Sequence, residues 1–278
     1  MSMPQQSQTK SMNTWTNAPT RSVDVLGTRF VYRQLGADSG VPVIFLNHLA
    51  AELDRWDPRV VDGIASRRRV IVFDNRGVGA SEGSTPNSVA AMAEDAVAFI
   101  RALGLEQVDL FGFSLGGFIS QVIAREEQRL VRKMILAGTG PAGGAGIDKV
   151  TSITLRDVTR GALTFKHPEY YLFFTGTSNG RNAARDFLRR LKERAENRDT
   201  PVSIATFITQ LKAIRAWQIR LLPICRAFAS QYSSRTAIRT RWCPAATRSI
   251  SPAASRMPNS CFTTTPGTGA YFNITKHS

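Results

Sequence analysis

One short stretch constrains the fold of this 278-residue chain more than any other: Gly112-Phe113-Ser114-Leu115-Gly116, followed by Gly117. The apolar run over 108–113 predicts a strand, and the pattern over 115–125 predicts a helix. A serine at such a sharp junction needs glycines on both sides because the backbone segments approach closely there. The turn would expose the Ser114 hydroxyl and aim the Leu115 N–H at developing negative charge. An incidental serine in a glycine-rich turn is the alternative that this context disfavours.

The flanking sequence alternates between strand and helix patterns. Residues 41–47 and 70–73 are short, predominantly apolar runs, as expected for strands that are buried on both faces. A helix is expected from Asn87 or Ser88 to Leu103, with an apolar face at helical spacing. The remaining predicted strands are 23–26 and 29–35, which form a hairpin, and 131–137. This alternation predicts an α/β fold in which helices cover both faces of a mostly parallel sheet.

The chain divides into four segments by composition. Residues 1–22 are polar and predict a flexible N-terminal arm, and 23–140 form the α/β core. Residues 141–217 carry a helical pattern, including 183–197, and predict a helical cap above the sheet. Tyr170, Tyr171, Phe173 and Phe174 either line a substrate pocket there or pack the core of the cap, and packing is the favoured alternative.

Residues 218–278 differ sharply from the rest of the chain. They hold eight of the 36 Lys and Arg residues and none of the 21 Asp and Glu residues, so they contribute more than half of the net charge of +15. All three cysteines lie here, and their odd number argues against a disulfide framework. Neither a secretion signal nor an apolar run of about twenty residues is present, which predicts a cytoplasmic protein with no membrane partner.

Two further motifs precede the serine. Leu46-Asn47-His48-Leu49-Ala50 follows the predicted strand over 41–47. Asp74-Asn75-Arg76-Gly77-Val78-Gly79-Ala80-Ser81 follows the strand over 70–73. Gly77 and Gly79 permit a tight turn that Asp74 and Arg76 tie down, and the spacing fits neither a dinucleotide nor a Walker-type phosphate loop. A structural role is favoured for this second motif.

In this order and spacing, the three motifs resemble the α/β-hydrolase superfamily over residues 23–217, particularly cofactor-free haloperoxidase-like and esterase-like enzymes. The resemblance implies an acyl-enzyme mechanism with Ser114 as nucleophile, between the elbow glycines Gly112 and Gly116. It implies an oxyanion hole made by the backbone N–H groups of Leu115 and Leu49, with Ala50 as the alternative to Leu49. His48 is expected to shape its loop. No cofactor or metal is expected, and the substrate is a small molecule with an ester-type bond.

The catalytic acid and histidine that the family places after the serine are not found. The only histidines are His48, His167 and His277, and no carboxylate side chain follows Asp199. His167 falls in the predicted cap, and His277 is the penultimate residue with no later element to anchor it. The chain as written is therefore expected to be inactive or impaired.

A shifted reading frame is our hypothesis for the missing groups. With free codon positions chosen to fit the family, residues 218–244 can hide a strand ending in a G-x-x-D-x-x-x-P loop. Residues 266–278 can hide G-H-G-G. The hidden Asp codon straddles Arg239 and Thr240, and the hidden His codon straddles Gly267 and Thr268. Loss of one G near the codon of Trp217 would produce the shift, and an unbroken reading frame in the DNA there would refute it.

Two other functions stay open. A pseudoenzyme would keep the pocket and bind a small ligand without turnover. The basic segment 218–278 could attract nucleic acid, but it lacks zinc-ligand spacing, an amphipathic helix and an aromatic-basic pattern, so no specific nucleic-acid partner is expected. The oligomeric state is not readable from the sequence.

Overall fold

The computed structural model describes residues 13–144 and 146–219. Its six strands form one sheet in the order β1-β2-β4-β3-β5-β6. The first two strands pair antiparallel with their neighbours, and β4, β3, β5 and β6 run parallel. The strands are β1 (Arg21–Val25), β2 (Thr28–Leu35), β3 (Val43–Leu46), β4 (Val70–Phe73), β5 (Val108–Phe113) and β6 (Val131–Ala137).

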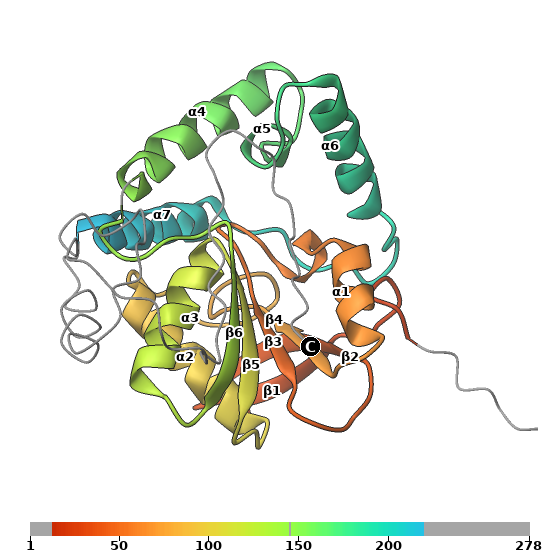
Figure 1. Ribbon diagram of the computed structural model, residues 1–278, viewed down its shortest axis with the longest axis vertical. Helices are drawn as coiled ribbons and strands as arrows, with labels where there is room; N and C mark the ends of the chain where they lie inside the picture. Colours follow the sequence, from red (N-terminus) through yellow and green to blue (C-terminus); the bar gives the residue numbers. More distant parts are fainter. Residues whose placement is uncertain (1–12, 145, 220–278) are drawn as a thin grey trace, which may run out of the picture.

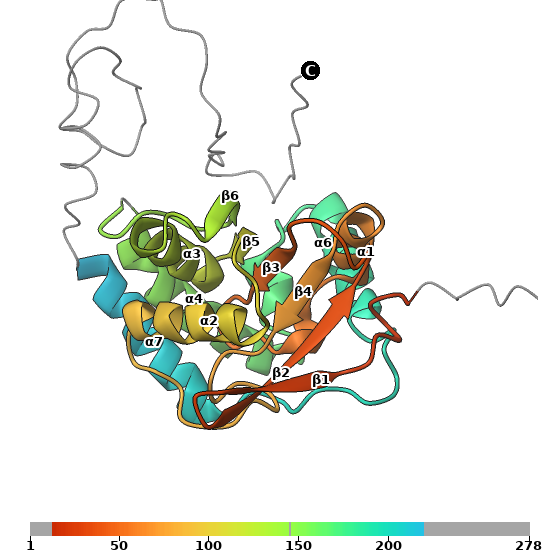
Figure 2. The same cartoon turned by 90° about the horizontal axis from the view of Figure 1, so that it is seen from below.

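Helices cover both faces of this sheet (Figures 1 and 2). The α-helices are α1 (Pro58–Ala65), α2 (Val89–Ala102), α3 (Leu115–Glu126), α4 (Val150–Leu163), α5 (Glu169–Leu172), α6 (Ser178–Arg190) and α7 (Ile204–Ile219). Two short 3-10 helices are η1 (Leu53–Arg55) and η2 (Ile147–Lys149). Figure 1 shows α4, α5 and α6 arching over one end of the sheet, on the side where the parallel strands end. The predicted α/β fold is confirmed.

Two apolar clusters, one on each side of the sheet, form the core. The larger cluster packs β-sheet residues such as Ile44 and Leu110 against α2, α3 and α7. The smaller cluster packs Phe45 and Phe111 against Val61 of α1. Every residue of β3 and β4 is buried, as predicted for strands covered on both faces. Ser88 caps α2 by accepting a hydrogen bond from the Ala91 N–H at 3.2 Å, which settles the choice between Asn87 and Ser88.

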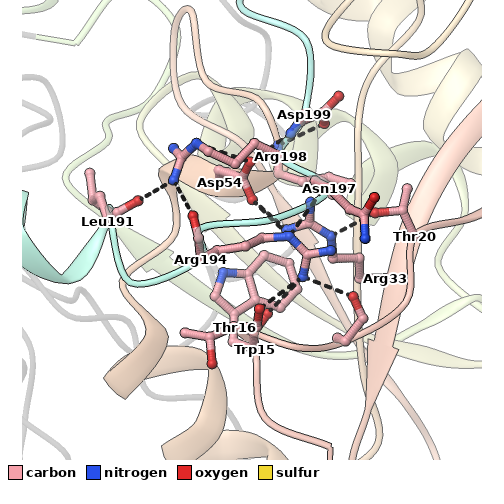
Figure 3. Close-up of polar contacts among 12 residues, drawn as sticks. Trp15, Thr16, Thr20, Arg33, Asp54, Leu191, Arg194, Asn197, Arg198 and Asp199 are labelled. Atoms are coloured by element: carbon pink, nitrogen blue, oxygen red, sulfur yellow. Dashed lines mark hydrogen bonds and ion pairs between the residues drawn. The ribbon is translucent and has the colours of Figure 1, made fainter.

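Part of the segment predicted to be a flexible arm is instead packed into the core. Trp15 is 2% exposed and belongs to the smaller cluster, and β1 already begins at Arg21. The Arg194 guanidinium donates to the carbonyls of Thr16 and Ala18 at 3.2 and 2.9 Å (Figure 3). A single tryptophan in a polar stretch gives no periodic pattern, and its burial arises from tertiary contacts. The local sequence therefore could not predict it. Residues 1–12 lie outside the described part of the chain.

The helix predicted over 183–197 also ends earlier than expected. α6 stops at Arg190, because the following residues turn back toward the sheet and Asn197 adopts a positive φ of 49°. The Arg198 guanidinium donates to the carbonyls of Leu191 and Arg194 at 3.0 and 2.8 Å, replacing helical hydrogen bonds (Figure 3). Buried Arg33 and Asp54 form an ion pair beside this segment at 2.5 Å. These charges hold residues 191–199 against the core.

No helix among the described residues is long and apolar enough to cross a membrane. The division into a core and a separate cap stays a prediction. The segment 218–278, with its proposed frameshift, lies almost wholly outside the described residues.

Strand β6 forms one edge of the sheet, and its outer side pairs with no strand in the described part of the chain. Ile135, an apolar residue of this strand, is 51% exposed to solvent. Unpaired edges of this kind promote association between chains. We expect Ile135→Lys to slow aggregation measured by light scattering, because an edge charge opposes strand pairing. Ile153→Lys on α4, at a residue 40% exposed, is the matched control, and equal slowing by both variants would contradict the role of the edge.

Candidate active site

Ser114 occupies the junction between β5 and α3 with a strained backbone. Its φ of 52° and ψ of −111° are rare for a residue with a side chain. The Ser114 N–H donates to the Ala137 carbonyl at 2.9 Å, and its own carbonyl accepts from the Thr139 hydroxyl at 2.8 Å. These hydrogen bonds hold the turn, and the Ser114 side chain is half-buried.

The flanking glycines are required by close backbone approach. A Cβ atom on Gly116 would overlap the carbonyl oxygen of Leu46 in β3, and a Cβ on Gly112 would lie 2.5 Å from the Gly116 carbonyl oxygen. Neither position can accept a methyl group without moving main chain in the centre of the sheet. The local pattern that predicted the junction thus has a steric cause.

The loop after β3 lies beside this junction, because β3 pairs with β5 and Leu46 is in register with Gly112. Asn47 fixes the start of the loop: its amide donates to the carbonyls of Ala51 and Phe73, both at 3.2 Å. The Asn47 side-chain oxygen accepts from the Trp56 indole N–H at 2.6 Å. Asn47 was not singled out from the sequence, and its buried position between two strand ends is what gives it this role.

The structure discriminates between the two candidate N–H donors of this loop. The Ala50 N–H is already bound to the side-chain oxygen of Gln210 in α7 at 2.8 Å. The Leu49 N–H has no hydrogen-bond partner among the described residues. Leu115 is the first residue of α3, so its N–H is one of the helix-start donors that have no intrahelical partner. The backbone N–H groups of Leu49 and Leu115 are therefore the two candidate donors that remain able to bind a ligand oxygen.

His48 is enclosed between the loop and the helices that follow β6. Its ring lies edge-on to the rings of Phe113 and Phe173, at centroid distances of 5.1 and 5.2 Å. Its Nδ1 is 2.9 Å from the Leu49 carbonyl oxygen, which requires Nδ1 to carry the proton. Burial first, and then the Arg55 charge, lower the pKa of His48 to about 3. A neutral, enclosed imidazole supports the interpretation that His48 shapes its loop.

The other described histidine, His167, also contacts Arg55 and lies away from the β5–α3 junction. Arg55 Nη2 is 2.7 Å from His167 Nε2 and 2.6 Å from Glu169 Oε2. Burial, and then the charge of Arg55, lower the pKa of His167 to about 4. Burial is also the main cause that raises the pKa of Glu169. This cluster joins η1 to α5, and neither histidine hydrogen-bonds the Ser114 side chain.

Arg76 anchors the turn after β4 to neighbouring elements. Arg76 forms an ion pair with Asp95 of α2 at 2.7 Å, and donates to the Thr28 hydroxyl at 2.7 Å. A Cβ on Gly79 would overlap Asp74 Oδ2, and Gly77 and Gly79 both have positive φ, 68° and 56°. The glycines therefore provide both the turn and the room for a buried carboxyl group.

That carboxyl group belongs to a cluster that the sequence did not reveal. Asp74 is fully buried and shares a hydrogen bond with Asp199, which follows α6 in the chain. Burial, the Asp199 hydrogen bond and the Asp199 charge raise the pKa of Asp74 well above its usual range. Burial is also the main cause that raises the pKa of Glu52 to about 7. Two ionised carboxylates would repel each other there, so Asp74 holds its proton to a higher pH than an isolated aspartate does.

No group of three or more His, Cys, Asp or Glu side chains in the described ranges could hold a metal ion. The acid and histidine loops proposed for the shifted frame lie beyond Ile219, outside those ranges. What the described residues do assemble is a half-buried serine on a strained turn, between a helix start and a neighbouring loop whose Leu49 N–H has no hydrogen-bond partner in the described ranges.

Known proteins share this architecture. A family model described as alpha/beta hydrolase fold matches residues 41–231. An alpha/beta hydrolase fold protein from Chitinophaga pinensis is 38% identical, with a TM-score of 0.71 over 75% of this chain and 74% of that one. A non-heme chloroperoxidase from Streptomyces lividans is 29% identical over 151 residues, which cover 52% of this chain and 55% of that protein.

A putative carbamate hydrolase from Agrobacterium fabrum is 31% identical over 102 residues, which cover 36% of this chain and 39% of that protein. The chain thus spans about half or less of the length of the curated relatives it matches. The resemblance seen in the three motifs is confirmed. This chain belongs to the alpha/beta hydrolase fold family.

Proposed function

We propose that this fold carries the nucleophile and oxyanion half of a serine hydrolase acting on ester-type bonds of small molecules. Ser114 would attack the carbonyl carbon and form an acyl-enzyme. The backbone N–H groups of Leu49 and Leu115 would stabilise the oxyanion that develops during attack. One similar protein is named a putative carbamate hydrolase, and a carbamate carries a carbonyl carbon of the kind that Ser114 would attack.

The observation that carries this proposal is the backbone of Ser114. A residue with a side chain is held at a φ of 52° on a strand-to-helix turn, between glycines that admit no methyl group. Such strain is maintained only where surrounding structure enforces it, and it is concentrated at functional sites. The second support is the use of the Ala50 N–H by Gln210, while the Leu49 N–H of the same loop has no hydrogen-bond partner among the described residues.

The other half of the mechanism is missing from the chain as written. Deprotonation of a serine hydroxyl needs a general base, which in this family is a histidine oriented by an acid. His48 is neutral and enclosed, and its Nδ1 is bound to the Leu49 carbonyl. We therefore propose that residues 218–278 replace the segment that would supply both groups, and that this chain is impaired. A cytoplasmic location remains part of the proposal.

Labelling by a fluorophosphonate probe tests both parts of the proposal. We expect the chain as written to label very slowly, and the chain with one base restored near codon 217 to label rapidly at Ser114. Removing the base costs a serine hydrolase most of its rate, on the order of a thousandfold or more. Ser114→Ala in the restored chain is the control that identifies the labelled residue.

The possible failures of this experiment are distinct. Rapid labelling of the chain as written would refute the claim of impairment but not the nucleophile. A restored chain that folds and does not label would refute Ser114 as the nucleophile. Binding of a small ligand by the unrestored chain, without turnover, would favour the pseudoenzyme alternative.

A further inference from the structure

A groove lies on the face of the molecule that carries α2 and α3, away from Ser114. It has a volume of about 500 Å³ and is bounded by the β1–β2 turn, α2 and the end of α3. Its apolar lining includes Leu26, Val97 and Ile123. Its lining also carries four carboxylates, those of Asp24, Glu94, Glu126 and Glu127 (the acidic rim), and the single guanidinium of Arg101. The groove therefore combines an apolar floor with a predominantly acidic rim.

Leu26 is an unusual residue for the turn that it occupies. Leu26 and Gly27 form a two-residue hairpin loop with φ of 54° and 77°, the type I′ geometry that strongly prefers Asn-Gly. The leucine is also 86% exposed. A strained backbone conformation and an exposed large apolar side chain both carry a cost, and an asparagine would remove both. Leu26 thus adds exposed apolar surface to the groove.

The rim is only partly neutralised by neighbouring cations. Glu127 forms an ion pair with Arg101 at 2.8 Å, and Glu126 pairs with Arg125. Asp24 accepts the Gly27 N–H at 3.0 Å, and neither Asp24 nor Glu94 has an ion-pair partner among the described residues. A binding partner for this surface would need both apolar side chains and positive charge.

Residues 220–228 of the same chain have that composition. Their sequence is R-L-L-P-I-C-R-A-F, with two arginines among four large apolar residues and no acid. They follow α7, whose Trp217 ring stacks on Phe118 of α3 at 5.3 Å. From Phe118 to Glu126 is about 12 Å along α3, whereas nine extended residues can span about 30 Å. The segment therefore begins within reach of the groove.

We propose that residues 220–228 dock into the groove formed by the β1–β2 turn, α2 and α3, with their apolar side chains against Leu26 and their arginines at the acidic rim. The contact is intramolecular and independent of the proposed hydrolase chemistry. It requires only the apolar floor, the excess of carboxylates and the short distance from the end of α7.

Photo-cross-linking from the native Cys225 tests this directly. The full chain with Cys243→Ser and Cys261→Ser is labelled at Cys225 with benzophenone maleimide, irradiated, digested and mapped by mass spectrometry. We expect cross-links to peptides containing 24–27, 94–101 or 123–127. Leu26→Asn should reduce them about tenfold, the change expected when burial of one leucine is lost, while relieving the strain of the turn. Leu163→Asn, at an exposed leucine of α4, is the matched control.

Two further arms define the outcome. Glu94→Lys should reduce the same cross-links, and Asp186→Lys on the exposed face of α6 should leave them unchanged. A mixture of light and ¹⁵N-labelled chains distinguishes docking within a chain from docking on a second copy. Cross-links between light and heavy chains, cross-links elsewhere on the surface, or insensitivity to Leu26→Asn would each overturn the proposal.

Discussion

Replacing Gly116 by alanine is expected to destabilise the protein by on the order of 3 kcal/mol or more. The added methyl group would overlap the Leu46 carbonyl oxygen, which belongs to a central strand and cannot move without breaking its pairing with β5. Urea unfolding followed by tryptophan fluorescence measures the effect. The loss should appear as a lower midpoint, or as failure to fold.

Gly63→Ala is the matched control for this substitution. Gly63 lies inside α1, and no atom would come within 4 Å of an added Cβ. Alanine is favoured over glycine in a helix by up to about 1 kcal/mol, so this variant should gain stability. If both variants had the same midpoint, close packing of the β5–α3 turn against β3 would be wrong.

The second large effect is a loss of stability as the pH rises. Burial, more than any neighbouring charge, raises the pKa of Glu52 from 4.5 to about 7 in the folded protein. Below pH 4.5 the carboxyl is protonated in both the folded and unfolded states. Above pH 7 it is ionised in both states, and the folded state then carries the cost of a buried charge. The stability that the neutral Glu52 carboxyl contributes is therefore lost as the pH rises from 4.5 to 7. The shift corresponds to roughly 3 kcal/mol.

Glu52→Gln isolates this contribution. The variant should be more stable than the unmodified chain at pH 8 and should approach it in stability near pH 4.5, as measured by urea unfolding at both values. The raised pKa of Asp74 acts in the same direction, and the charge of Glu52 is one of its smaller causes, so Glu52→Gln removes part of that rise as well. Glu196→Gln, at an exposed position, is the control for the loss of one carboxylate. A variant equal to the parent at pH 8 would show that the Glu52 side chain stays solvated.

Local sequence pattern was sufficient for the central elements of the fold. The strands at 70–73, 108–113 and 131–137 were predicted with the bounds that the structure has, because uninterrupted apolar runs and glycine-flanked turns are determined by neighbouring residues. The Ser114 junction belongs to this class. Gly116 is required by its close approach to Leu46 of β3, and Gly112 by its close approach to the Gly116 carbonyl within the same turn.

Features that depend on distant residues were missed. The burial of Trp15 depends on the smaller core cluster around α1, and the early end of α6 depends on arginines that turn back to the core. The Asp74–Asp199 pair joins residues 125 positions apart, and nothing in either local sequence indicates that two acids meet. These features arise from packing, which periodicity and spacing do not encode.

The hydrogen bond between the Ala50 N–H and Gln210 joins the loop after β3 to the last described helix, across 160 positions of sequence. Every residue that shapes the anion-stabilising side of the proposed site therefore precedes the codon where the frame is proposed to change. Loss of a single base there would keep the groups that stabilise the developing negative charge and remove the groups that transfer the proton.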